Sequence, residues 1–395
     1  MQKYIRVSFL YFFLAACIGL LLRWHFINPI SWLTFPFWLH AHSHLMFLGW
    51  IFNLLSIAFV QENIKQDHRK KYTILFMIIQ VLLMGMLISF PLQGYGVYSI
   101  ALSTLHTVLV GVFSFWFFQD TKNIDFDPSR WFARISLIFF LVSSIGPFAL
   151  GALMANGFAQ TKWYYFSVYY YLHFQYNGVF TFGVFSLFFS LLRERGMIPI
   201  QFLIKRFGYL MLISCFLAYS LSTLWATPGL VFNVLGLVAT LMQLVALTYF
   251  LKIVRSIPIT IIRNVSQSAR LLFMVAFLAF ISKLILQTLS AHSSIAQLAY
   301  ENRNYVMAYL HLVLLGIFSC FLLGWSIEKK WIKKPSQLVT ALFLIGFVGM
   351  ELTLISRIPT GNVLINSSHL LFLFSLMIAS GVGVIFINTL IKRIR

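Results

Sequence analysis

The sequence has few charged residues, few cysteines and very few acidic residues for its length. Only 10% of its 395 residues are charged, whereas soluble domains carry about 25%. This shortage excludes an ordinary soluble protein. The three cysteines lie inside apolar runs without a Cys-x-x-Cys pair, which gives no support for disulfides, a zinc site or covalently attached haem. Walker-type glycine loops, Gly-x-Ser-x-Gly and His-Glu-x-x-His are also absent.

Hydrophobic residues, at 60% of the chain, form runs long enough to cross a bilayer, which takes about 20 residues. We therefore predict an all-α integral membrane protein of about twelve transmembrane helices, forming one polytopic domain over residues 1–395. The first run has no clear small-residue cleavage site and is kept as a helix. No internal repeat with matched broken helices is evident, which argues against a secondary transporter. The predicted spans are 7–23, 37–60, 73–92, 97–118, 133–155, 164–192, 208–226, 229–251, 270–290, 304–326, 337–356 and 363–390.

Lysine and arginine orient these spans. Of the 29 basic residues, 24 fall at the N-terminus, at the C-terminus and in every second loop, while the other loops hold four. The positive-inside rule then places both termini in the cytoplasm of a bacterial inner membrane. The basic residues that give the chain its net charge of +20 lie between the apolar spans. We therefore expect contact with anionic lipid and none with nucleic acid.

Five histidines are predicted to share one depth in the membrane. Each follows the start of its span by about 7–10 residues, or roughly 10–15 Å, from the outer side. Histidines that merely bond neighbouring helices would not be expected to choose one depth. The five are His44, His106, His173, His311 and His369.

Residues 39–50 contain three histidines at the mouth of the second span. His40 and His44 lie one helical turn apart on one face, and His42 points elsewhere. Polar side chains at membrane depth indicate functional sites, and neutral imidazole is a common ligand of haem iron. We predict a b-type haem between His44 and His311, and Arg357 in an outer loop is placed to bind its propionates. His40 and His42 are further candidates for contacts with this group.

Two residues that normally carry a full charge lie deep within predicted spans. Lys283 needs a partner, a water-filled path or a route by which it snorkels to the outer face, and Glu351 has the same alternatives. Together they could form an ion pair or a proton or ion path.

One segment resembles subunit I of the haem-copper oxidase superfamily. Residues 304–314 read Asn-Tyr-Val-Met-Ala-Tyr-Leu-His-Leu-Val-Leu, and the family's segment reads Tyr-x-Val-Ala-His-Phe-His-Tyr-Val-Leu. The superfamily includes cytochrome oxidases and nitric oxide reductases. The resemblance implies a twelve-helix bundle in which His311, with His44 or alternatively His42, binds a low-spin haem. It also implies propionate contacts near Arg357 and a copper ligand at His173.

The sequence also departs from that pattern. Tyr309 stands where the family has the histidine of its oxygen-reducing haem, and residues 223–228 lack the family's paired copper histidines. Copper could instead recruit His106, His173 and His369, and a tyrosine can itself bind haem iron. Residues 42–49 are also similar to the His-Ala-His-Glu-Met-Leu-Phe-Gly signature of NnrS-type haem and copper proteins, with Leu45 in place of the glutamate.

These observations predict electron transfer or redox or gas sensing by a haem protein, with quinol or a separate cytochrome as electron donor. Partner subunits would fit this role. Two alternatives stay open. One is a reductase of oxygen or nitric oxide with a remodelled haem or copper site. The other is a cofactor-free membrane transporter that uses Lys283 and Glu351.

Overall fold

The computed structural model describes residues 2–122, 125–197, 200–227, 229–356 and 367–391. Over these ranges the chain is all-helical and has no β-strand. Twelve helical segments are long and apolar enough to cross a membrane, which confirms the predicted class and number of spans. The turns that separate neighbouring spans near residues 94 and 227–229 have positive φ angles at Gly94, Thr227 and Gly229, so the chain reverses there instead of continuing as one helix.

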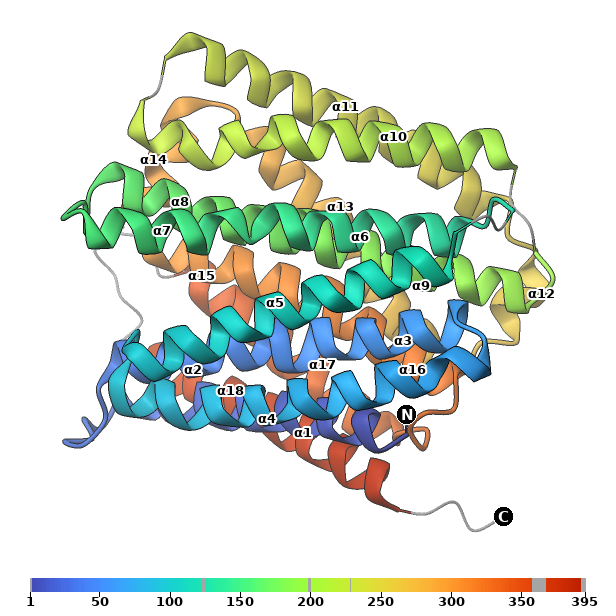
Figure 1. Ribbon diagram of the computed structural model, residues 1–395, viewed down its shortest axis with the longest axis horizontal. Coiled ribbons are helices and arrows are strands. Elements are labelled where there is room, and N and C mark those ends of the chain that lie inside the picture. Colours follow the sequence, from blue (N-terminus) through green and yellow to red (C-terminus); the bar gives the residue numbers. More distant parts are fainter. Residues whose placement is uncertain (1, 123–124, 198–199, 228, 357–366, 392–395) are drawn as a thin grey trace. The chain divides into compact units, whose positions relative to one another are not determined.

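Figure 1 shows the helices of the chain. They divide into two compact units. Unit 1 comprises Met1–Lys122, Ser266–Leu272 and Ser319–Arg395, and unit 2 comprises Asn123–Val265 and Phe273–Phe318. The helices up to residue 122 are α1 (Gln2–His25), α2 (Phe35–His44), η1 (Leu45–Phe52), α3 (Asn53–Asn63), η2 (Gln66–His68), α4 (Arg69–Gln93) and α5 (Val97–Asp120). The remaining helices of unit 1 are α16 (Cys320–Glu328), α17 (Gln337–Ser356) and α18 (Ser367–Leu390).

Unit 2 begins with α6 (Pro128–Ser143), α7 (Ile145–Ala155), α8 (Lys162–His173), η3 (Phe174–Phe180) and α9 (Thr181–Glu194). It continues with α10 (Gln201–Leu217), η4 (Ala218–Ala226), α11 (Leu230–Arg255) and α12 (Ile259–Arg263). The last group is α13 (Gln267–Ser290), α14 (Ser293–Glu301), α15 (Arg303–His311) and η5 (Leu312–Ser319). The first turns of α13 and the last residue of η5 belong to unit 1.

In unit 1, α1 packs against α2, η1 and α18, and α18 packs against α17. Trp50 of η1 is fully buried in this packing. Its indole stacks on Phe12 with 4.4 Å between ring centroids, and its Nε1–H donates to the Ser319 hydroxyl at 2.9 Å. A buried tryptophan with a satisfied N–H anchors the core of this unit.

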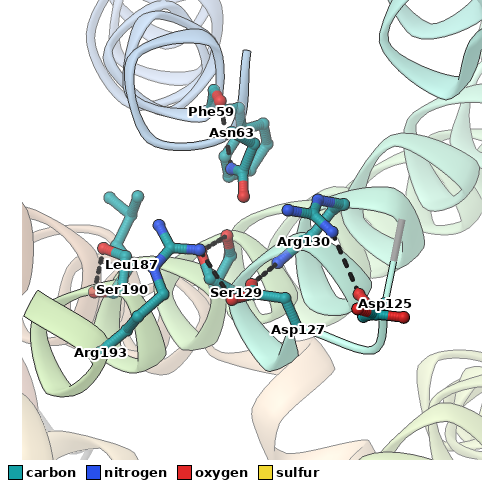
Figure 2. A network of polar contacts seen from close by, with 10 residues as sticks. Phe59, Asn63, Asp125, Asp127, Ser129, Arg130, Leu187, Ser190 and Arg193 are labelled. Atoms are coloured by element: carbon teal, nitrogen blue, oxygen red, sulfur yellow. Dashed lines mark hydrogen bonds and ion pairs between the residues drawn. The ribbon is translucent and has the colours of Figure 1, made fainter. Parts of the chain in front are cut away.

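In unit 2, α6 packs against η3 and α9, α7 against α8, and α10 against α11. Asp127 fixes the start of α6. One of its carboxylate oxygens accepts from the backbone N–H of Arg130 at 2.9 Å, and the other pairs with the Arg193 guanidinium at 2.7 Å. Figure 2 shows these contacts together with the bond from Arg130 to the Asp125 carbonyl. The carboxylate thus caps one helix and ties it to the end of α9.

Candidate functional site

Three of the predicted histidines occupy the same local structure. His44, His173 and His311 are each the last residue of an α-helix, and a π-helix follows each of them directly. The π-helices have eight, seven and eight residues. π-Helices are rare and are frequently found at functional sites, so these three junctions are candidate functional positions.

The spans that carry these junctions are also the most buried ones. In the most apolar part of the spans that carry His44, His173 and His311, 89%, 89% and 67% of the residues are buried, respectively. In each of the other nine spans the buried share is 56% or less. We did not predict these π-helices from the sequence. A signal was nevertheless present, because a glycine stands five residues after each histidine, at Gly49, Gly178 and Gly316.

The glycines allow neighbouring helices to come close. A Cβ atom on Gly49 would lie 3.0 Å from the Cβ of Tyr11 in α1, and one on Gly178 would lie 2.5 Å from the Cγ of Phe139 in α6. Distances below 3.0 Å are not tolerated without movement. At these two junctions the π-helix is therefore packed tightly against the span that precedes it.

His44 lies on α2 in unit 1 with its imidazole orientation fixed. Its Nδ1–H donates to the carbonyl of His40, one turn earlier, at 2.9 Å. This bond assigns the proton to Nδ1 and leaves the lone pair of Nε2 to bind a ligand. The Phe90 ring covers the imidazole at 4.2 Å between centroids. The side chain lies deep in the protein and keeps part of its surface accessible.

His40 and His42 point to different neighbours. His40 lies 4.5 Å from the ring of Tyr95, on the same side as His44, as helical spacing predicts. His42 instead donates from Nδ1 to the carbonyl of Ala15 in α1 at 2.8 Å. Gly19 leaves room for this ring, because a Cβ there would come within 3.0 Å of it. The Nε2 of His42 can also act as a ligand, so His42 stays the alternative to His44.

His106 and His369 differ strongly in their surroundings. His106 is fully buried in α5, and neither of its ring nitrogens has a hydrogen-bond partner in the described part of the chain. His44 is close enough for the two side chains to interact electrostatically. His369 is the third residue of α18 and is exposed.

His173 in unit 2 is held by hydrogen bonds at both ring nitrogens. Its Nε2–H donates to the carbonyl of Cys215 at 2.8 Å, and its Nδ1 accepts from the Asn177 amide at 3.1 Å. A metal could bind this ring only if one of these bonds broke. Among the described residues there is no group of three or more His, Cys, Asp or Glu side chains that could hold a metal ion. His106 and His369 belong to unit 1 and His173 to unit 2, so a copper site made of these three stays a prediction.

Tyr309 of α15 also makes contacts within unit 2. Its ring packs edge-on against Tyr176 at 5.9 Å, and the two hydroxyls share a hydrogen bond. Tyr176 also bonds to Ser222. The hydroxyls of Tyr309, Tyr176 and Ser222 therefore form one hydrogen-bonded network.

Lys283 and Glu351 are both buried, with 1% and 9% of their surface exposed. Neither snorkels out of the bundle, so that alternative does not apply. Lys283 lies in unit 2 and Glu351 in unit 1, and the ion pair between them stays a prediction. The pairing of His44, in unit 1, with His311, in unit 2, stays a prediction for the same reason. Arg357 lies outside the described residues.

A scan against protein-family models finds no match to this chain, and a search of curated proteins finds none either. The resemblance of residues 304–314 to haem-copper oxidase subunit I, and that of residues 42–49 to NnrS-type proteins, therefore rest on these short motifs.

Proposed function

We propose that this chain is a haem protein of the bacterial inner membrane that transfers electrons or senses redox state or a gas. His44 is one axial ligand of a b-type haem, and His311 is the proposed second ligand. The observation that supports this proposal best is the hydrogen bond from His44 Nδ1–H to the His40 carbonyl. It holds the imidazole in the tautomer that an axial ligand needs.

The other residues of this region have supporting roles in the proposal. Phe90 covers one face of the His44 ring and limits its rotation. Apolar and aromatic neighbours keep water away from a bound macrocycle. The haem, when bound, supplies a one-electron couple, and quinol or a separate cytochrome is the proposed electron donor.

Gas reduction has less support than electron transfer. The oxidase family carries out that reaction at a second centre, and here the equivalent side chains are occupied. His173 uses both ring nitrogens in hydrogen bonds, and Tyr309 is bonded to Tyr176. Copper bound through rearranged histidines would revive the reductase alternative.

The test is a reduced-minus-oxidised optical spectrum of the purified chain, with haem and copper quantified per polypeptide. We expect one reducible six-coordinate haem and no copper. His44→Ala should abolish the spectrum. His40→Ala should preserve it, because His40 bonds to His44 through its backbone carbonyl, which alanine retains. Haem that survives in His44→Ala but not in His42→Ala would transfer the ligand role to His42. A colourless wild-type protein would refute the proposal.

A further inference from the structure

The connection between α16 and α17 in unit 1 carries a dense run of basic residues. Residues 329–334 read Lys-Lys-Trp-Ile-Lys-Lys. The helical segments on both sides, which end at Glu328 and begin at Gln337, are long and apolar enough to cross a membrane. A connection this short between two spans has to lie at the surface of the bilayer. It belongs to the set of loops that the positive-inside rule predicts to be cytoplasmic.

Lys330 occupies a position that glycine usually takes. The N–H of Lys330 donates to the carbonyl of Ile327 at 3.0 Å. The N–H of Trp331 donates to the carbonyl of Ser326 at 2.9 Å, and this pair of bonds defines a Schellman motif at the end of α16. The φ angle of Lys330 is +57°, in the left-handed region, which disfavours any residue with a Cβ atom. A strained lysine at this position indicates that its side chain has a function that glycine could not supply.

Two apolar side chains anchor the residues that follow. The Trp331 ring packs edge-on against Trp325 of α16 with 4.6 Å between centroids, and Ile332 is 4% exposed. A hydrophobic contact of this kind commonly accompanies a Schellman motif. Because five consecutive residues of extended chain span at most about 14 Å from first to last, the lysines of this turn form one compact basic surface. We call this surface the basic turn, and its exposed members are Lys330, Lys333 and Lys334.

The two carboxylates next to the basic turn are used elsewhere. Glu62 of α3 pairs with Lys329, and the two side chains are largely buried. Glu328 accepts from the backbone N–H of Ser266 at 3.1 Å. One lysine of the run thus ties α16 to α3 inside unit 1, while the three exposed lysines present a charge of +3 at the surface.

We propose that the basic turn is a binding site for the phosphate headgroup of an anionic phospholipid. Its charge is complementary to that headgroup, and its place between two spans brings the lysines to the depth of the lipid phosphates. Each lysine close to an anionic membrane surface strengthens binding about fivefold. The proposal assigns to one turn the lipid contact that composition predicts for the chain at large, and it does not depend on the proposed haem.

Native mass spectrometry of the purified full-length chain tests this site, with phosphatidylglycerol as the probe and phosphatidylcholine as the neutral comparison. The wild-type protein should bind its first phosphatidylglycerol more tightly than phosphatidylcholine. Lys330→Gly should weaken that binding about fivefold. The same variant should lower the unfolding equilibrium constant about fivefold in an SDS titration, because glycine fits the left-handed position. Weaker binding by a more stable protein could not be ascribed to misfolding.

A charge-matched pair of triple variants separates this site from general attraction. Lys330→Gly/Lys333→Gln/Lys334→Gln should weaken phosphatidylglycerol binding roughly a hundredfold. Lys70→Gln/Lys122→Gln/Lys252→Gln, which removes three exposed lysines from other basic loops, should retain it.

Four outcomes would overturn the proposal. Unchanged phosphatidylglycerol affinity in Lys330→Gly is the first, and equal losses in the two triple variants are the second. Equal affinity of the wild type for the two lipids is the third and would favour an acidic protein as the partner. Displacement of the lipid by an equal concentration of inorganic phosphate is the fourth and would assign the turn to free phosphate.

Discussion

Gly178, five residues after His173, should not tolerate a methyl group. A Cβ at this position would lie 2.5 Å from Cγ and 2.7 Å from Cβ of Phe139. The Cβ of Phe139 is attached to the backbone, so a change of side-chain rotamer cannot relieve the clash. The Phe139 ring is also confined by Phe174, Phe182 and Phe216, at 5.8, 5.3 and 5.2 Å between centroids.

The expected cost of Gly178→Ala combines three effects. Overpacking of a filled core costs about 1–3 kcal/mol. A shift of α6 would also weaken the bond from the Ser136 hydroxyl to the Val179 carbonyl, now 2.7 Å, at a cost of about 1 kcal/mol. Alanine regains about 1 kcal/mol through its higher helix propensity. We therefore expect the free energy of unfolding to fall by about 2 kcal/mol.

Gly151→Ala is the matched control, because a Cβ on Gly151 in α7 would meet no atom within 4 Å. This variant should gain up to about 1 kcal/mol from propensity alone. Unfolding by SDS titration in mixed micelles measures both variants. The double variant Gly178→Ala/Phe139→Ala should be more stable than the sum of its single effects by at least about 1 kcal/mol. Equal stability of Gly178→Ala and Gly151→Ala would refute the reasoning.

Three further predictions concern polar contacts between helices, and the same unfolding titration measures each. Trp50→Phe keeps the stacking but loses the indole hydrogen bond, and should cost about 1 kcal/mol; no loss would mean that the bond contributes nothing. Asp127→Ala should cost about 1–2 kcal/mol. Asp127→Asn, which keeps the cap but weakens the pairing with Arg193, should cost less, and the reverse order would contradict the capping role. Glu62→Gln should cost about 3 kcal/mol because it leaves the largely buried Lys329 without its carboxylate. The double variant with Lys329→Gln should recover part of this loss, and an additive result would exclude the pairing.

The twelve spans could be predicted because a bilayer demands long apolar runs, and this demand is visible in composition. The predicted ends of these spans agree less well with the structure. The seventh span begins at Gln201 instead of residue 208, since Lys205 and Arg206 lie inside the helix and lower the local hydropathy. Helices extend past the apolar run wherever basic side chains reach the interface.

The site could be predicted only in part. Helical spacing placed His40 and His44 on one face, and the common contact with Tyr95 agrees with it. The partners of His42 and His173 are backbone carbonyls of other helices, Ala15 and Cys215, and no sequence pattern marks a carbonyl. The burial of Lys283 was equally inaccessible, because a lysine in a span can point inward or snorkel, and tertiary packing decides between the two.

The π-helix after each histidine lets its span hold one residue more than a continuous α-helix needs for the same number of turns. Each residue of an α-helix turns the chain by about 100°, so an extra residue without a wider turn would rotate everything that follows it. Asn53 and Ser56 of α3 are buried in the present register. Removing one residue from within 45–52 should therefore convert the wide turn to α-helix and leave these two side chains facing as they do now. The same deletion inside α3, between Asn53 and Ser56, should instead rotate Ser56 away from its neighbours.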